Sequence, residues 1–152
     1  MVRKIFILIL PIVFFTTLAV SAQTGGKLES GLNKEVGPIR SSPAYAEILL
    51  KKTELQADIE SFLADYTEEN PKVIDARFEL GVLIKYLDRI YAVRPSETSK
   101  LTQALGKLIV RRAGLEVDLA RLQRSYNKDH PEVKRAKRRI VVYEVAIKEI
   151  LG

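Results

Sequence analysis

Apolar residues recur along most of the chain with the spacing of one face of a helix. Over residues 71–92 and again over residues 131–151 they follow alternating steps of three and four positions. The two stripes are Val73, Ala76, Leu80, Leu83, Leu87 and Ile90, and Val133, Ala136, Ile140, Tyr143, Ile147 and Ile150. Because such steps draw a single stripe along an α-helix, both segments are predicted to be amphipathic helices.

Two further stripes, over residues 43–65 and 97–125, follow the same rule with one step missing. Their members are Tyr45, Ile48, Leu55, Ile59, Phe62 and Tyr66, and Leu101, Leu105, Leu108, Leu115, Leu119, Leu122 and Tyr126. Lys52 and Arg112 occupy the missing steps. Each either fixes the register of a helix pair or extends its charged end to solvent. No segment favours a strand, so the predicted fold class is all-α with four helices.

Proline and small polar residues mark where these helices begin. Pro43, Pro71 and Pro131 stand at predicted first turns, where a missing N–H and a fixed φ cost little. The predicted N-caps are Ser42, Asn70, Ser96 and, as a weaker cap, His130.

The chain repeats itself at an offset of 60 residues, so that residues 44–91 align with residues 104–151. The coinciding pairs include Leu55 and Leu115, Asp58 and Asp118, Tyr66 and Tyr126, Pro71 and Pro131, Val73 and Val133, Ala76 and Ala136, and Ile90 and Ile150. Each unit reads as helix, short turn and helix, which favours antiparallel neighbours. The sequence predicts two tandem helical hairpins, 43–92 and 99–152, joined by a linker at 93–98, with coiled-coil or four-helix-bundle packing.

The predicted hairpin turns carry matching residues. They are Tyr66, Asn70 and Pro71 in the first turn and Tyr126, His130 and Pro131 in the second. Tyr66 and Tyr126 are expected to pack over their turns and anchor the hairpin geometry. The alternative is that they form a pair that stacks on carbohydrate.

The N-terminal segment has the three parts of a secretory signal. Arg3 and Lys4 precede sixteen uncharged residues at 5–20, and small residues lead up to Ala22. We predict a signal peptide over 1–22 that is cleaved near Ala22, and a Gly-containing flexible leader over 23–42. The expected location is therefore periplasmic or secreted. The alternative is an inner-membrane anchor formed by residues 5–20.

Composition removes several kinds of chemistry. The chain has no Cys and one His, which excludes disulfides, thiol catalysis and sites that need two imidazoles. No phosphate-binding loop, nucleophile elbow or dinucleotide fingerprint is present. Asp129, His130 and Glu132 lie close in sequence, but we interpret His130 as a turn or cap residue. The prediction is a protein that is not an enzyme and has no catalytic, metal or cofactor site.

Charge differs sharply between the two units. Residues 44–91 hold 6 Lys and Arg against 10 Asp and Glu, whereas residues 104–151 hold 12 against 6. The acidic hairpin is hypothesised to dock on the basic one.

The basic residues of the second unit form a candidate patch for an anionic partner. Its members are Arg121, Arg124, Lys128, Lys134, Arg135, Lys137, Arg138 and Arg139. Cations at the start of a helix oppose its dipole, so another interaction is expected to compensate them. That interaction is either an anionic lipid or glycan, or the acidic first hairpin. Nucleic acid is not an expected partner after export.

The run Leu119-Ala-Arg-Leu122-Gln-Arg-Ser-Tyr126-Asn-Lys-Asp-His130-Pro131-Glu-Val133 resembles the periplasmic coiled-coil segment of bacterial polysaccharide chain-length determinant proteins, the polysaccharide co-polymerases. The first unit is similar but has Asn70 in place of the histidine. The resemblance covers the turns and adjoining helices, and it implies an extended periplasmic hairpin in the context of polysaccharide export. Because a second membrane segment and a P-loop are missing, we expect the structural element rather than a complete co-polymerase.

The predicted function is that of an exported, non-enzymatic scaffold or interaction module of the cell envelope. A protein partner or self-association is expected. The alternative is a periplasmic holdase chaperone, broadly similar to the Skp-type chaperones in size, charge and helix content.

Overall fold

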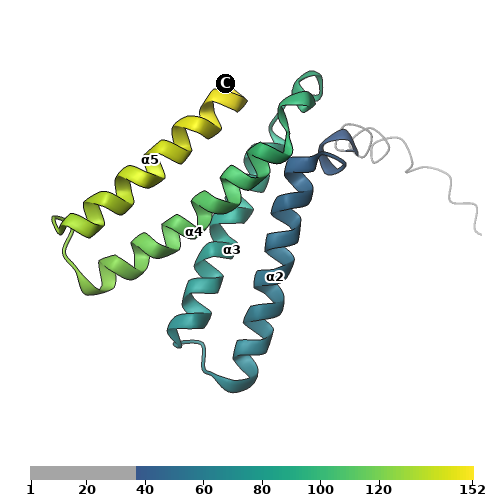
Figure 1. Ribbon diagram of the computed structural model, residues 1–152. Coiled ribbons are helices and arrows are strands. Elements are labelled where there is room, and N and C mark those ends of the chain that lie inside the picture. The colour runs from purple at the N-terminus through teal and green to yellow at the C-terminus, as the bar shows by residue number, and fades with distance from the viewer. Residues whose placement is uncertain (1–36) are drawn as a thin grey trace, which may run out of the picture.

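The computed structural model describes residues 37–152, and these residues form helices and connecting turns without a strand (Figure 1). The predicted all-α class is therefore confirmed for this part of the chain. The signal peptide predicted over 1–22, the alternative anchor at 5–20 and the leader up to residue 36 lie outside the described residues.

Four long helices carry the fold. They are α2 (Pro43–Asp65), α3 (Pro71–Tyr91), α4 (Gln103–Ser125) and α5 (Pro131–Leu151). The predicted caps Ser42 and Asn70 begin α2 and α3, because their side chains accept hydrogen bonds from the backbone N–H groups of Tyr45 and Lys72. The predicted bounds of 43–65 and 131–151 match the structure, and α3 ends one residue before the predicted 92.

The predicted start of the third long helix at residue 97, with Ser96 as its cap, is wrong. Residues Pro95–Lys100 form a separate 3₁₀ helix, η1, and α4 begins only at Gln103. The hydroxyl of Thr102 accepts a hydrogen bond from Leu105 N at 3.3 Å and caps α4 instead. Leu101 lies between the two helices, fully buried, and its carbonyl accepts a hydrogen bond from Ala44 N. The connection between the units is thus longer than the predicted linker and is anchored to the first helix.

The last residues of the predicted flexible leader are ordered against the core. Residues 37–40 form a helical turn, and the Ile39 side chain is only 3% exposed among the core residues. The Ser42 hydroxyl donates a hydrogen bond to the Ile39 carbonyl at 2.6 Å. Burial of one apolar side chain next to a good N-cap therefore extends the folded region upstream of Pro43.

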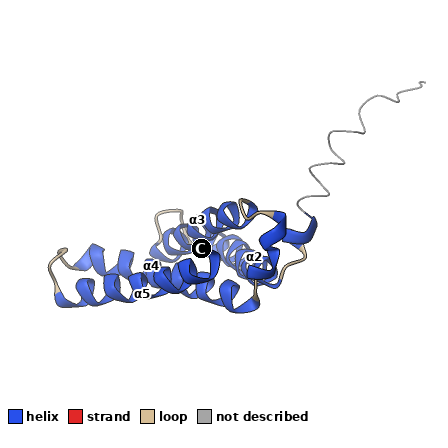
Figure 2. Ribbon diagram, turned by 90° about the horizontal axis from the view of Figure 1, so that it is seen from above, coloured by secondary structure: helices blue, strands red, loops and turns tan. Residues whose placement is uncertain are grey.

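The helices pack as two pairs, and α4 of one pair also packs on the other pair. α2 packs on α3, and α4 packs on α5, while α4 also packs on both α2 and α3. Figure 1 shows the turn of each pair pointing in a different direction, and Figure 2 shows α4 and α5 side by side, reaching beyond α2 and α3. We call α2 and α3 the first helix pair, and α4 and α5 the second helix pair. Because α5 packs chiefly on α4, the four helices do not surround one common axis.

Most of the core lies where α4 meets the first helix pair. Its completely buried side chains include Ile48 of α2, Leu83 and Ile90 of α3, and Leu105 and Ile109 of α4. These belong to one cluster, which joins the two pairs into one folding unit.

Gly106 lets α4 approach α2 closely. A Cβ atom at this position would lie 2.7 Å from Glu47 Cβ and 3.0 Å from the Ala44 Cα and carbonyl oxygen. Since two of these three atoms belong to the backbone, the helices would have to move apart to admit a methyl group.

We expect Gly106→Ala to lower the free energy of unfolding by about 1–3 kcal/mol, because of overpacking at this crossing. The matched control is Gly81→Ala in α3, where a Cβ meets nothing within 4 Å. That variant should gain about 0.5–1 kcal/mol through the better helix propensity of alanine. Urea unfolding of both variants measures the difference, and equal effects of the two substitutions would refute the close approach.

Candidate interaction surface

An acidic side chain of the first helix pair is clamped by two basic side chains of the second. The Asp75 carboxylate of α3 accepts hydrogen bonds from Arg121 Nε at 2.6 Å and from Arg124 Nη2, both on α4. The Asp75 side chain is only 9% exposed, whereas the two arginines keep about half of theirs exposed. Two members of the candidate basic patch therefore pair with the acidic unit.

The clamp shifts the protonation of Asp75. Burial by itself would raise the pKa of the Asp75 carboxyl, but the hydrogen bonds and positive charges of Arg121 and Arg124 outweigh it and hold that pKa below its usual value. The carboxylate is thus charged at neutral pH, which keeps both hydrogen bonds charge-assisted.

Glu144 of α5 gathers a second set of contacts between the pairs. Its carboxylate accepts a hydrogen bond from the Tyr86 hydroxyl of α3 at 2.9 Å and lies 3.5 Å from Arg89 Nη1. Arg112 Nε of α4 lies 3.1 Å from Glu144 Oε2 in an ion pair but does not donate a hydrogen bond to it, and Arg112 also pairs with Glu116. Arg112, which interrupts the apolar stripe, therefore turns toward α3 and α5 rather than toward solvent.

The Tyr86 ring lies at the centre of this network. The guanidinium carbons of Arg89 and Arg112 lie 4.9 Å and 5.2 Å from its centroid. Burial and the hydrogen bond to Glu144 raise the pKa of the Tyr86 hydroxyl, so it stays protonated and donates. These residues line an open cleft of about 260 Å³ together with Val82, Lys85 and Glu116. Arg112 forms ion pairs with both Glu116 and Glu144 in this cleft.

The rest of the candidate basic patch does not contact the first helix pair through ion pairs. Lys134 lies 3.4 Å from Asp129, and Arg135 lies 2.6 Å from Glu132, both next to the start of α5. The other members, Lys128, Lys137, Arg138 and Arg139, are exposed and have no acidic partner within residues 37–152. Two of the eight members of the patch thus pair with the first helix pair, and the other six make no ion pair with it.

The exposed side of α5 combines cations with valines. Val141, Val142 and Val145 are 59%, 66% and 49% exposed. The exposed cations of the same helix are Lys134, Arg135, Lys137, Arg138, Arg139 and Lys148, and its exposed acids are Glu132 and Glu149. We call these eleven exposed residues the α5 outer face. Burial of Val133 and Ile147 turns this face away from α4 and leaves it open to a partner.

The first turn carries its predicted residues as helix boundaries. Asn70 caps α3, Pro71 is its first residue, and Tyr66 ends α2 by donating its N–H to the Phe62 carbonyl. The Lys72 ammonium lies 5.1 Å from the centroid of the Tyr66 ring. Tyr66 therefore lies at the end of α2 beside the first turn of α3, and it is 41% exposed.

The second turn repeats this arrangement with a histidine. His130 Nδ1 accepts a hydrogen bond from Glu132 N at 3.3 Å as the cap of α5, which begins at Pro131. The Tyr126 ring stacks on the His130 ring, with their centroids 4.0 Å apart. Within residues 37–152, no three His, Cys, Asp or Glu side chains gather in a way that could hold a metal ion.

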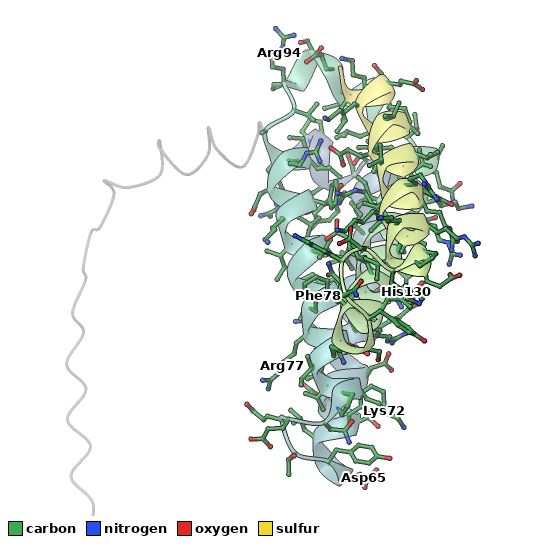
Figure 3. The ribbon with its side chains drawn as sticks, turned by 90° about the vertical axis from the view of Figure 1, so that its left-hand side faces the viewer. Asp65, Lys72, Arg77, Phe78, Arg94 and His130 are labelled. Carbon is green, nitrogen blue, oxygen red and sulfur yellow. The ribbon has the colours of Figure 1, made fainter. Side chains whose placement is uncertain are left out.

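The two turn tyrosines do not form a common platform. Figure 1 places the two turns at separate ends of the molecule, and Figure 3 places His130 of the second turn far above Asp65 and Lys72 of the first. The hypothesis that Tyr66 and Tyr126 stack on carbohydrate stays untested, and the separation of the two turns does not support a shared platform within one chain.

None of the helices in the described part of the chain has the length and apolar character that crossing a bilayer demands. Comparison with protein-family models, with curated proteins and with solved structures finds no significant match. The resemblance to chain-length determinant proteins stays a prediction.

Sequence reasoning missed the residues that join the pairs. Asp75, Tyr86 and Glu144 lie off the four apolar stripes, so the stripes give no reason to single them out. The three valines of α5 carried a usable signal, since Val141, Val142 and Val145 extend the apolar surface of a helix outside its stripe.

We expect Asp75→Asn to lower the free energy of unfolding at pH 7 by about 1–3 kcal/mol, because one acceptor oxygen is replaced by a donor and the carboxylate charge that strengthens both hydrogen bonds is removed. The pKa of Asp75 is lower in the folded chain than in the unfolded chain, where an Asp titrates near about 4. The clamp therefore stabilises fully above that pH and is lost as the pH falls through the folded pKa.

The check is urea unfolding of the wild type and of Asp75→Asn from pH 7 down to about pH 2, a range chosen to bracket the carboxyl pKa. Their difference should shrink with acid. Asp58→Asn, which removes an exposed carboxylate with no ion pair among the described residues, is the control and should change little. A difference that stays constant over this pH range would contradict the clamp.

Proposed function

We propose that this chain is a non-enzymatic interaction module of the cell envelope, built as two tandem helical hairpins, that binds an acidic partner through the α5 outer face. The observation that carries the proposal is the exposure of Lys137, Arg138 and Arg139 without acidic neighbours, beside Val141 and Val142. Unpaired cations attract an acidic surface, and exposed valines add apolar contact area once it is bound.

The cell-envelope context rests on the sequence of the N-terminal segment. A basic start, an uncharged stretch and small residues before Ala22 are typical of export signals. The resemblance of the run from Leu119 to Val133 to chain-length determinant proteins supports polysaccharide export as the setting.

The non-enzymatic part of the proposal rests on how the polar groups are used. Asp75 and Glu144 are held in ion pairs between helices, and His130 caps a helix while stacked on Tyr126. In these places the polar groups stabilise helix ends and crossings, which is the work of a scaffold.

The triple variant Lys137→Ser, Arg138→Ser and Arg139→Ser tests the acidic partner. These side chains make no ion pair within residues 37–152, so we expect an unchanged melting temperature. Binding to each of two probes should fall by about tenfold or more, as for a loss of charge complementarity. One probe is vesicles that contain phosphatidylglycerol, and the other is the immobilised wild-type chain, whose residues 44–91 are acidic.

A triple variant with the same change in net charge serves as the control. Arg77, Lys85 and Arg94 are exposed cations of the first unit and its linker, and Arg77 and Arg94 make only surface ion pairs. Their replacement by serine should leave binding to both probes intact. Equal loss of binding in the two triple variants would show a general charge effect and refute the α5 outer face as the site.

A further inference from the structure

The internal repeat allows the contact between the two helix pairs to be compared with the equivalent surfaces that are exposed. In this chain, α4 lies on the first helix pair with Ile109 and Ala113 in the shared core and with Gly106 against Ala44. The face of α4 that does this is defined by Gly106, Ile109, Val110, Ala113 and Val117, which are buried or half-buried. One repeat unit therefore docks a helix on the other.

The corresponding face of α2 is exposed. Sixty residues earlier stand Ala46, Leu49, Leu50, Thr53 and Ala57, and all five are exposed. Leu49 and Leu50 are 39% and 59% exposed at the centre of this face. We call these five residues the α2 outer face. Gln103 at the start of α4 lines a shallow cleft with Ala46 and Leu50 of this face, and the face is otherwise exposed.

The surface of the first helix pair that contacts α4 also has a counterpart on the second helix pair. It is covered in the first pair and exposed in the second. Val82 of α3 is 6% exposed in the first pair, and its counterpart Val142 of α5 is 66% exposed in the second. Asp75 is buried in the first pair, whereas its counterpart Arg135 is exposed. The second helix pair thus presents the same groove without an occupant.

The charges of the two open faces are opposite. In the groove of the first pair, the acidic Glu47, Asp75 and Glu79 receive a basic helix. The groove of the second pair has Lys107, Arg135 and Arg139 at these positions. Beside the α2 outer face, α2 carries exposed Glu54 and Glu60. Within the chain an acidic groove meets a basic helix, and between copies a basic groove would meet an acidic helix, so the two surfaces attract each other in both cases.

We propose that the α2 outer face of one copy docks in the groove between α4 and α5 of a second copy, repeating between chains the contact that joins the two pairs within one chain. This inference rests on the proposed function, because it identifies the acidic partner as the chain itself. The contact is heterologous, since two different faces meet, so two joined copies still have one free groove on one copy and one free α2 outer face on the other. Further copies can add at both ends, which gives open head-to-tail chains unless the rotation between copies closes a ring.

The repeat also assigns a particular ion pair between copies. A Cβ at Gly114 of α4 would lie 4.0 Å from Glu79 Oε1 of α3, so positions 114 and 79 face each other across the contact. Their counterparts are Glu54 and Arg139. Glu54 of one copy and Arg139 of the next are therefore opposed. Ala46 stands in place of Gly106, so the two copies approach less closely at that end than α4 approaches α2.

Charge reversal at these two positions tests the contact. We expect Glu54→Arg and Arg139→Glu each to weaken self-association by about tenfold or more, because like charges then face each other. The double variant, with both substitutions, should recover association. Sedimentation velocity over a concentration series at low and high salt is the measurement. The wild type should grow in size with concentration without stopping at a dimer, and salt should reverse the growth.

Controls separate this proposal from the more general function. Glu69→Arg makes the same charge change in the exposed first turn and should leave association unchanged. Circular dichroism melts show whether each variant is folded. A wild type that stays monomeric at about 1 mM, where even weak contacts form, overturns the head-to-tail contact. A closed dimer, or a double variant that fails to recover, overturns it equally.

Vesicle binding distinguishes failure of the contact between copies from failure of the proposed function. If Arg139→Glu loses binding to phosphatidylglycerol vesicles while the wild type shows no self-association, the acidic partner is a lipid surface and only the self-docking is refuted. If the wild type binds neither vesicles nor itself, the proposed function fails together with this inference.

Discussion

The structure depends on one helix that is buried on two sides. α4 packs on α5, and it also packs on the first helix pair through small and apolar residues that include Gly106 and Ile109. Two helices of this length have little core of their own. By packing on α5 and on both helices of the first pair, α4 joins the two helix pairs into one unit.

Charge then decides how the two pairs meet. Apolar burial is not directional, but the Asp75 clamp and the Glu144 network lie at two separate places along the contact and require particular partners. The excess of acid in the first unit and of base in the second therefore appears in the Asp75 clamp, whereas in the Glu144 network the acid belongs to the second unit and Arg89 to the first. Cations of the second unit that take no part in these contacts lie on the α5 outer face, where they can attract an acidic partner.

Much of the fold could be predicted from local pattern. The apolar stripes, the prolines at helix starts and the caps Ser42 and Asn70 each depend on residues a few positions apart, so they can be read from sequence. The start of α4 could not be predicted in this way. The Leu101 carbonyl accepts a hydrogen bond from Ala44 N, far away in sequence, and Leu101 therefore lies before α4 and not within it. The second face of α4 was missed for a related reason. Its Gly106 and Ala113 are small, and small residues mark a close crossing only once the neighbouring helix is known.

Hydrogen exchange along α4 tests most directly whether this helix holds both pairs together. If it does, amides in the middle of α4 open only when the whole domain unfolds, and they should be the slowest to exchange, whereas amides on the exposed side of α5 should exchange faster. Equal protection of α4 and α5, with α2 and α3 more protected than both, would show that the second pair is a separate appendage and would contradict the account.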